Sequence, residues 1–316
     1  MSKVLVTGGA GFIGTNLVRK LLEDGHEVCS VDNFTIGSRE HAELFKENPN
    51  YHFLEIDIDN MDEFLMRLKD IKFDIVYHLA ANSDIQKGGQ NPSVDYRDTF
   101  STTRSVLELM RQNNIKNLFF ASTSAIYGDV EGERATEDLG GLKPISYYGG
   151  AKYASEGFIS AYSFMCDFRT MIFRFPNVVG PYLTHGVIYD FTKKLINNPN
   201  QLEILGDGHQ IKPYIYVDDL IDVIIRMTKD IPAGVEIYNI GVESATSVNR
   251  IADIVCEVLD FDNVEYKYTG GSVGWKGDVP RFQYNLDKIH KTGWKANCTS
   301  DEAVRKTAEW ARERVK

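Results

Sequence analysis

The chain has 316 residues, of which 43% are hydrophobic and 25% are charged, a composition typical of a globular protein with a large buried core. Its formal net charge of −10 argues against nucleic acid and anionic membranes as partners, because both are negatively charged. The four cysteines and seven histidines are scattered along the chain, so we expect neither a disulfide framework nor a metal site.

Short β-rich runs alternate with helical patterns through the first half of the chain. Between residues 12 and 22, for example, apolar side chains recur close to the helical period of about 3.6. The runs that we expect to be strands are largely apolar and lie at residues 4–6, 27–31, 51–55, 74–79, 117–121 and 171–175. Such strands, joined by helices, predict an α/β fold with a doubly wound parallel sheet of the Rossmann type.

The pattern becomes mixed after residue 176. We expect a helix over residues 187–197 and strands over residues 202–205, 214–217 and 235–240, with Asp218 and Ser247 as helix caps. The expected domains are therefore a dinucleotide-binding Rossmann domain over residues 1–176, with a returning strand near 235–240, and a smaller mixed α/β substrate-binding region over residues 177–316.

A glycine-rich loop separates the first expected strand from the first expected helix. Residues 9–14 fit the pattern G-x-G-x-x-G, and Gly8 precedes them. Glycines there permit a tight turn and a close approach of the backbone to a pyrophosphate, which the N–H groups of the helix terminus then bind. Asp32 ends the next strand 18 residues after Gly14, and a carboxylate there binds ribose hydroxyls and repels a 2′-phosphate. The motif therefore predicts NAD as the cofactor.

Tyr148 and Lys152 stand four residues apart at the start of an expected helix, and so on one face of it. A nearby ammonium lowers the pKa of a phenol, so we expect Tyr148 to act as a base. The same spacing occurs at Tyr189 and Tyr284, but only Tyr148 opens a helix and follows polar residues at 122–124 that end a strand. The carboxyl edge of an open parallel sheet is where ligands bind.

These motifs together carry a family resemblance that covers nearly the whole length. The chain resembles the extended short-chain dehydrogenases/reductases, and among them the nucleotide-sugar epimerases of the UDP-glucose 4-epimerase type. Besides the loop, Asp32 and the Tyr148/Lys152 pair, the matching segments are residues 57–58, 79–81, 122–128, 174–181, 206–208, 214–219 and 277–278.

The resemblance implies roles for individual residues. Tyr148 would be the catalytic base, Lys152 would bind the nicotinamide ribose, and Thr123 would hydrogen-bond the reacting hydroxyl. The implied NAD-binding residues are Gly8, Gly11, Phe12, Ile13, Gly14, Asp32, Asn33, Asp57, Ile58, Leu79, Ala80, Ala81, Tyr148 and Lys152. The implied substrate-binding residues are Ser83, Ser124, Asn177, Val187, Ile188, Leu202, Ile204, Lys212, Arg281 and Phe282.

The segment after Thr123 bears on the reaction. The 4,6-dehydratases of the family that this chain resembles have two acidic residues directly after the corresponding threonine, whereas this chain has Ser124 and Ala125. Elimination needs a proton donor and acceptor beside the sugar, so their absence favours epimerisation, with UDP-glucose and UDP-galactose at C4 as the first choice. A nucleotide-sugar oxidoreductase or reductase, a dehydratase, and an epimerase acting at another carbon remain alternatives.

Several positions depart from the pattern of the 4-epimerases. Thr99 replaces the usual asparagine, Lys212 the usual arginine, and Trp275 an arginine before the Gly-Asp pair, so Lys212, Lys276 and Arg281 are all candidates to bind the diphosphate. Phe282 falls where the family has a gatekeeper for the C2 substituent, and a bulky ring there suggests a plain hexose.

Location and assembly are expected from simpler features. The first residues lack the pattern of a signal peptide and no apolar run is long enough to span a membrane, so we expect a cytoplasmic protein with no membrane partner. His78 ends a strand and is expected to be a satisfied core residue. The aromatic side chains between residues 153 and 164 suit the helix-pair interface common in the family, and we expect a homodimer.

Overall fold

The computed structural model describes residues 1–130, 132–271, 277, 279 and 281–315. The chain divides into two compact units. The first consists of Met1–Ile126, Lys143–Arg174 and Ile224–Tyr238, and the second of Tyr127–Leu142, Phe175–Val223 and Asn239–Lys316. The functional assignment of residues 1–176 to the cofactor and 177–316 to the substrate stays a prediction.

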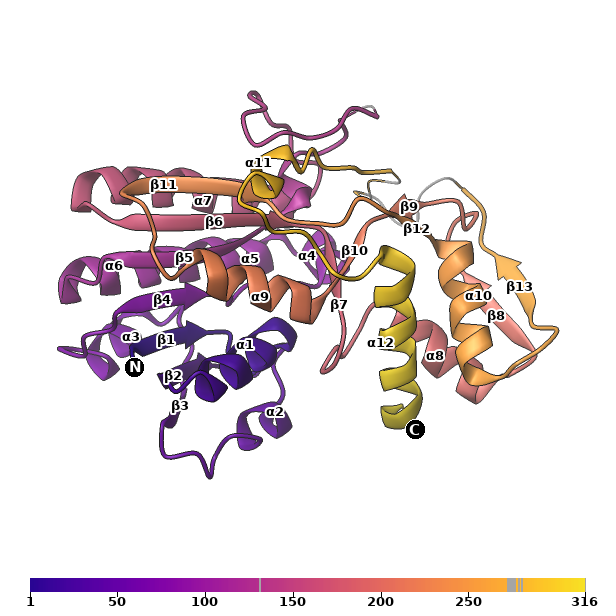
Figure 1. The fold of residues 1–316 in the computed structure, drawn as a ribbon, viewed down its shortest axis with the longest axis horizontal. Coiled ribbons are helices and arrows are strands. Elements are labelled where there is room, and N and C mark those ends of the chain that lie inside the picture. Colours follow the sequence, from indigo (N-terminus) through magenta and orange to yellow (C-terminus); the bar gives the residue numbers. More distant parts are fainter. Residues whose placement is uncertain (131, 272–276, 278, 280, 316) are drawn as a thin grey trace. The chain divides into compact units, whose positions relative to one another are not determined.

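A seven-stranded parallel sheet carries the first unit, and its strands follow the order β11-β6-β5-β4-β1-β2-β3 (Figure 1). β1 pairs in parallel with both β2 and β4, so the strand order reverses next to β1. This confirms the expected Rossmann-type fold. The strands are β1 (Lys3–Thr7), β2 (Glu27–Asp32), β3 (Tyr51–Glu55), β4 (Ile75–His78), β5 (Asn117–Thr123), β6 (Arg169–Phe175) and β11 (Gly234–Asn239).

Helices cover both faces of this sheet because right-handed crossovers lie on one face on one side of β1 and on the opposite face after the strand order reverses. α1 lies on one face, and α3, α6 and α7 pack side by side on the other (Figure 1). The helices up to α7 are α1 (Phe12–Glu23), α2 (Arg39–Glu43), α3 (Met61–Arg67), α4 (Ile85–Gln90), α5 (Pro92–Asp95), the π-helical turn η1 (Tyr96–Ser101), α6 (Thr102–Asn113), the 3-10 turn η2 (Ser124–Ile126) and α7 (Tyr147–Cys166).

The core between the sheet and these helices is apolar and fully buried. Leu5, Val76, Leu118 and Phe120 from the strands meet Leu107 of α6 in one contiguous cluster. Burial of such side chains contributes roughly 1.5–3 kcal/mol each relative to exposure. The continuous apolar character of the strands therefore follows from their being covered on both faces.

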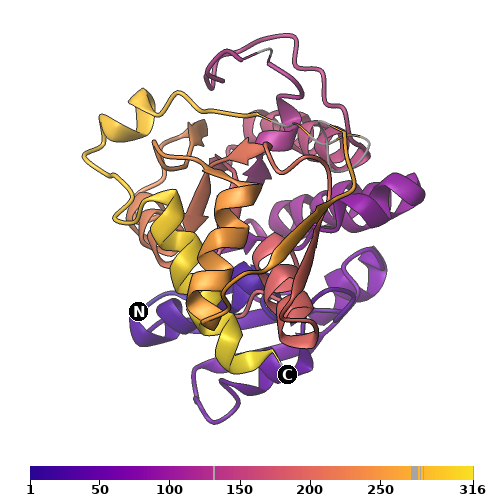
Figure 2. The ribbon, with the colours of Figure 1, turned by 90° about the vertical axis from the view of Figure 1, so that its right-hand side faces the viewer.

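Three two-stranded sheets and a group of helices form most of the second unit. Its helices α10 (Val248–Leu259) and α12 (Ser300–Arg314) lie side by side, in orange and yellow in Figure 2. The remaining elements are β7 (Asn177–Val179), α8 (Val187–Asn197), β8 (Gln201–Ile204), β9 (Ile211–Lys212), β10 (Tyr214–Tyr216), α9 (Val217–Met227), β12 (Thr246–Ser247), β13 (Glu265–Tyr268) and α11 (Asp287–His290), with α9 continuing into the first unit. β7 pairs with β10, β8 with β13, and β9 with β12.

The two expected helix caps had different outcomes. Ser247 is the N-cap of α10, and its side chain accepts a hydrogen bond from the backbone N–H of Arg250, which confirms the expectation. The prediction for Asp218 is wrong, because α9 begins directly after β10 and places Asp218 inside its first turn. An acid is favourable there through the partial positive charge of the helix terminus.

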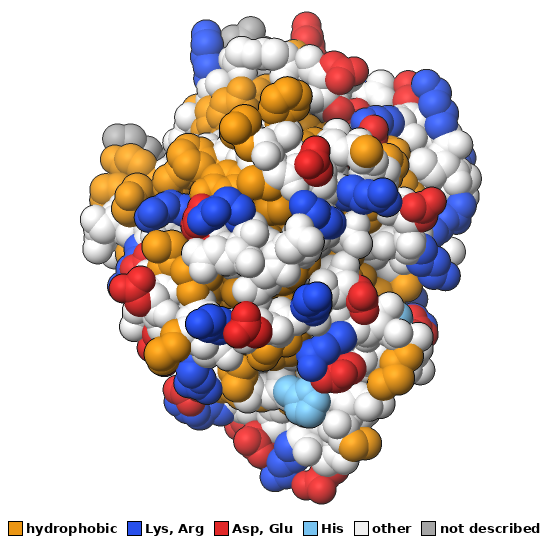
Figure 3. All heavy atoms as spheres, turned by 90° about the vertical axis from the view of Figure 1, so that its left-hand side faces the viewer, with side chains coloured by type: hydrophobic (Ala, Val, Ile, Leu, Met, Phe, Trp, Pro, Cys, Tyr) orange, Lys and Arg blue, Asp and Glu red, His pale blue; other side chains and the backbone are white. Residues whose placement is uncertain are grey.

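The surface carries charges and apolar groups in mixture. Figure 3 shows one face on which apolar side chains lie between lysines, arginines and acidic groups. In the part of the chain that the structure describes, no helix is long and apolar enough to cross a membrane, and no three metal-ligating side chains lie together.

Candidate active site

The glycine-rich loop forms a close-packed cradle at the start of α1. Gly8 has φ of +72°, and a Cβ on it would lie 2.7 Å from the backbone N of Ala80. A Cβ on Gly14 would lie 2.1 Å from the carbonyl O of Gly8. α1 starts after Gly11, and within the described residues no side chain caps it. The first-turn N–H groups and the helix dipole therefore suit a pyrophosphate.

Asp32 stands beside this cradle at the end of β2. Its carboxylate accepts hydrogen bonds from the backbone N–H of Ala10 at 3.1 Å and of Phe34 at 2.8 Å. Burial raises the pKa of Asp32, and these backbone N–H groups act in the opposite direction. The carboxylate is thus held at the loop, and the cradle and the acid together fit an adenine dinucleotide with a free 2′-hydroxyl.

Thr123 and Tyr148 meet where β5 ends and α7 begins. Thr123 is the last residue of β5, and Tyr148 is the second residue of α7, whose N-cap Ser146 accepts a hydrogen bond from Gly149. The hydroxyl of Thr123 lies close enough to Tyr148 to act on the pKa of its phenol. A phenol and a hydroxyl at this edge can hold one substrate hydroxyl between them and move its proton.

Lys152 lies one helical turn after Tyr148 and is 2% exposed. Its ammonium donates a hydrogen bond of 2.6 Å to the carbonyl of Ala121 and sits 4.6 Å from the ring centroid of Phe120. Burial lowers the pKa of Lys152 to about 7, and the negative charge of Glu156 acts in the opposite direction. The lysine therefore changes its charge close to neutral pH.

The pKa of Tyr148 differs from the expectation. Burial, with a smaller contribution from the charge of Asp95, raises the pKa of Tyr148 to about 12, although the hydroxyl of Thr123 acts to lower it. The expected lowering by Lys152 is wrong for the free protein, because burial disfavours the phenolate and also weakens the charge on the lysine. Tyr148 therefore keeps its proton at neutral pH until other positive charge approaches.

His78 is a satisfied core residue, as expected. Its Nδ1 lies 2.7 Å from the hydroxyl of Thr7 and its Nε2 lies 3.0 Å from the hydroxyl of Thr103. Burial, aided by the charge of Lys152, lowers the pKa of His78 to about 3. The ring is neutral at physiological pH and braces β1 against α6.

The segment after β4 contains residues that the sequence did not single out. Residues 79–81 lead to Asn82, whose backbone N–H donates to Thr99 and whose side chain donates to Asp95 at 2.8 Å. Asp95 is 1% exposed and burial raises its pKa. Thr99 lies in the π-helical turn η1, a geometry often found near functional sites. No local sequence pattern indicates that Asp95 is a buried acid near the site.

The other predicted site residues of the first unit lie on its loops, except Phe12 and Ile13, which begin α1, and Ser124, which begins η2. Ile58 is buried, whereas Asp57 and Ser83 are exposed, and Asn33, Leu79, Ala80, Ala81 and Ser124 are half-buried. Their contacts with cofactor or substrate stay predictions.

The remaining predicted substrate residues belong to the second unit. Asn177 and Arg281 are exposed and Val187 and Lys212 are half-buried, but Ile188, Leu202 and Ile204 are fully packed inside. Phe282 is buried in an aromatic cluster, with its centroid 5.9 Å from that of Tyr127 and 4.8 Å from that of Tyr284. Trp275, Lys276 and Asp278 lie outside the described residues.

Comparisons with known proteins agree on one family. Residues 4–241 match the model of the NAD dependent epimerase/dehydratase family. A solved UDP-galactose 4-epimerase is 37% identical, covers 99% of this chain and 100% of its own, and has a TM-score of 0.87. The UDP-glucose 4-epimerase of Thermus thermophilus, solved in complex with NAD, is 29% identical over 99% of this chain and 100% of its own, also with a TM-score of 0.87. The dTDP-D-glucose 4,6-dehydratase of Homo sapiens is 26% identical, with 98% of this chain and 90% of its own covered.

Proposed function

Because the chain belongs to the NAD-dependent epimerase/dehydratase family, with NAD as its cofactor, we propose that it epimerises a nucleotide sugar, with UDP-glucose and UDP-galactose at C4 as the first choice. The observation that carries this proposal is the group formed by Thr123, Tyr148 and Lys152 at the carboxyl end of β5. The sugar specificity is supported by relatives that are UDP-galactose and UDP-glucose 4-epimerases.

The proposed roles follow from the chemistry of each group. When bound, NAD would supply the acceptor for a hydride from the carbon that bears the hydroxyl and the donor that gives this hydride back to the opposite face of the sugar. Thr123 holds the sugar hydroxyl, and Tyr148 takes its proton and later gives it back. Lys152 supplies positive charge to the phenol of Tyr148 and orients the cofactor ribose. Since Tyr148 has a pKa of about 12 in the free protein, loading the site must lower that pKa before the proton can move.

Elimination is disfavoured by the residues that follow Thr123. Ser124 and Ala125 begin the turn η2, and neither side chain can donate and accept protons as a carboxyl group does. Asp95 is the nearby acid that acts on Tyr148, but it is 1% exposed and hydrogen-bonded to Asn82. The dehydratase reaction is therefore the second choice, although the human relative is a dehydratase.

A product assay tests the proposal. The protein is incubated with UDP-glucose, UDP-galactose and their N-acetyl forms, and the products are resolved by chromatography. Formation of the C4 isomer without net reduction of NAD supports an epimerase, whereas a 4-keto-6-deoxy sugar or stoichiometric cofactor turnover identifies one of the alternatives. Inactivity towards all four sugars moves the test to CDP-, GDP- and dTDP-sugars.

Neighbouring tyrosines provide a matched pair of variants. Tyr148→Phe removes only the proposed base and is expected to lower turnover by at least about a hundredfold, the usual contribution of a positioned base. Tyr147→Phe changes the adjacent residue, which is 55% exposed, and is expected to leave turnover unchanged. Equal turnover of the two variants would show that Tyr148 is not the base.

We also propose that the protein is a homodimer. The rings of Tyr96, Phe100 and Phe158 contact one another in succession from η1 to α7, with centroids 5.9 and 5.1 Å apart. Tyr96 is 66% exposed. Phe164 and Met165 at the end of α7 are exposed as well. An apolar face of this kind is typical of an interface. Light scattering should give the mass of two chains, reduced to one by Phe158→Glu, and a parent mass of one chain would contradict the proposal.

A further inference from the structure

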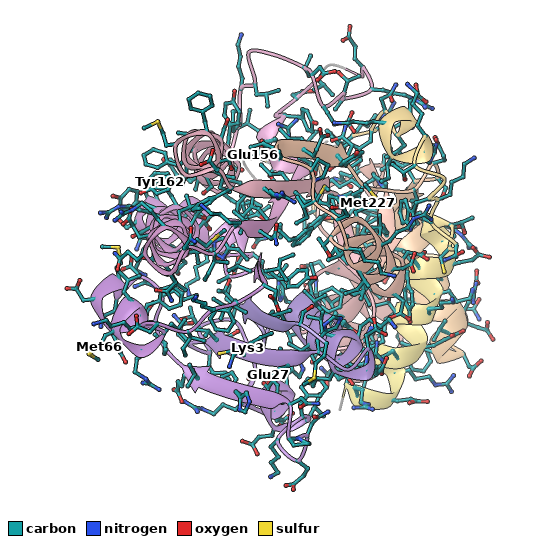
Figure 4. The ribbon with its side chains drawn as sticks, turned by 60° about the vertical axis from the view of Figure 1, so that its left-hand side comes forward. Lys3, Glu27, Met66, Glu156, Tyr162 and Met227 are labelled. Carbon is teal, nitrogen blue, oxygen red and sulfur yellow. The ribbon has the colours of Figure 1, made fainter. Side chains whose placement is uncertain are left out.

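A buried ion pair lies beneath the catalytic helix and takes no part in the roles proposed so far. Arg174 of β6 donates two hydrogen bonds to Glu156 of α7, of 2.7 Å from Nη2 to Oε2 and 3.1 Å from Nε to Oε1. Both side chains are 5% exposed. Removing two charges from water costs about as much as their attraction returns, so stability alone is a weak reason for such a pair. Glu156 is labelled in Figure 4, on α7.

The pair is connected to the catalytic residues through β5. Three successive residues of this strand act on three side chains of α7: Ala121 accepts a hydrogen bond from Lys152 at 2.6 Å, Ser122 donates one to Glu156 at 2.5 Å, and the hydroxyl of Thr123 acts on the phenol of Tyr148. The three helix residues are spaced four apart and therefore lie on one face. Any shift of Glu156 along the sheet would carry Lys152 and Tyr148 with it.

The charges around Lys152 give Glu156 a second effect. The titratable groups that act on the lysine are Glu156 from α7 and His78 from β4, and Arg174 from β6 is paired with Glu156. His78 is neutral and Tyr148 keeps its proton, so neither offsets the ammonium. The carboxylate of Glu156 does, because an opposite charge nearby favours the charged form.

We propose that Glu156, held by Arg174 and Ser122, is a positioning residue that favours the protonated form of the Lys152 side chain and holds it at the carbonyl of Ala121. Lys152 can then orient the cofactor ribose and supply charge to Tyr148 at neutral pH. This inference rests on the proposed function only in that it concerns the same catalytic pair. Without Glu156, Lys152 would lose its proton at a lower pH than it does when Glu156 is present.

The experiment measures the titration of the Lys152 side chain by NMR. Lysine side chains are labelled with ¹³C at Cε in the full chain, with and without added NAD, and the signal missing from Lys152→Met identifies Lys152. In Glu156→Gln the midpoint of its titration is expected to fall by about one pH unit, a tenfold change in acidity constant. Glu156→Asp keeps the charge and should restore the midpoint. This readout needs no turnover, so failure of the proposed function and failure of this inference are separable.

Two further variants keep the test decisive. Glu156→Gln leaves Arg174 buried without its ion pair and can fail to fold, so Glu156→Gln with Arg174→Gln removes both charges. This double variant is expected to lower the titration midpoint of Lys152 less than Glu156→Gln alone does. A decrease should remain, because the carboxylate of Glu156 acts on Lys152 more strongly than Arg174 does. Glu108→Gln is the control: Glu108 accepts a hydrogen bond from Tyr162 of α7, which is labelled in Figure 4, and its loss should leave the midpoint unchanged. An unchanged midpoint in the variants that lack Glu156 overturns the proposal.

If the protein is active, the pH profile must agree with the titration. A neutral Lys152 no longer supports Tyr148, so the alkaline limb of kcat should move to lower pH in Glu156→Gln and return in Glu156→Asp. A purely structural role would lower the amount of folded enzyme at every pH and leave the limb in place, which would contradict a positioning role.

Discussion

Replacing Lys152 by methionine is expected to stabilise the free protein while abolishing its activity. The lysine is 2% exposed, and burial lowers its pKa from 10.5 to about 7. Each pKa unit corresponds to about 1.4 kcal/mol, so the fold pays at most roughly 5 kcal/mol at pH 7 for this ammonium. Methionine has a similar length and no charge, but it leaves the carbonyl of Ala121 without this donor, which costs about 1–3 kcal/mol. The difference is a net gain of at most about 2–4 kcal/mol at pH 7.

The pH dependence of this gain identifies its cause. Because the folded pKa of Lys152 is depressed, the unfolded chain binds more protons between about pH 7 and pH 10, and the parent becomes more stable as the pH rises through this window. The advantage of Lys152→Met should therefore shrink by about 2 kcal/mol from pH 7 to pH 9.

Urea denaturation of the cofactor-free proteins at both pH values measures this difference. Lys20→Met is the control, since Lys20 forms an exposed pair with Asp24 on α1 and should show little pH-dependent change over the same range. If Lys152→Met is less stable than the parent by the same amount at pH 7 and pH 9, burial of the ammonium is not what strains this site, and the reasoning is refuted.

Two other predictions concern the cofactor cradle. Gly14→Ala puts a Cβ 2.1 Å from the carbonyl of Gly8, so the affinity for NAD, measured by calorimetry, should fall at least about tenfold. In the control Gly157→Ala on α7, the new Cβ meets nothing within 4 Å, and the free energy of unfolding should rise by about 0.5–1 kcal/mol. An unchanged NAD affinity in Gly14→Ala would contradict the close packing of the loop. Asp32→Asn keeps the shape of the side chain but removes its charge, so the preference for NAD over NADP should drop, and an unaltered ratio of the two affinities would show that another group repels the 2′-phosphate.

Much of the fold could be predicted because it is written in local patterns. The loop between β1 and α1 and the apolar strands each carry a signal within a few residues, and the cap at Ser247 does too. Asp218 was misplaced because no residue separates β10 from α9, so the strand pattern and the helix start overlap. Element boundaries are the part of a sequence pattern with the least physical constraint.

The electrostatics of the site could not be predicted in the same way. The four-residue spacing of Tyr148 and Lys152 indicates that the two groups are neighbours, but their pKa values depend on burial by elements that are distant in the chain. Ser122 and Arg174 lie 34 and 18 residues from Glu156. The sequence shows only that Glu156 follows Lys152 by four residues. Without knowledge of its partners on the sheet, nothing distinguishes Glu156 from the other acids of the chain.

The central claim is that the hydride removed from the sugar returns to it within one protein molecule. UDP-galactose carrying deuterium at C4 is incubated with the protein as purified, and the UDP-glucose formed is examined by mass spectrometry and proton NMR. The account predicts that the deuterium stays at C4 of the product while the configuration there is inverted. Replacement of the deuterium by solvent hydrogen would contradict it, because the carbon would then have exchanged a proton instead of a hydride.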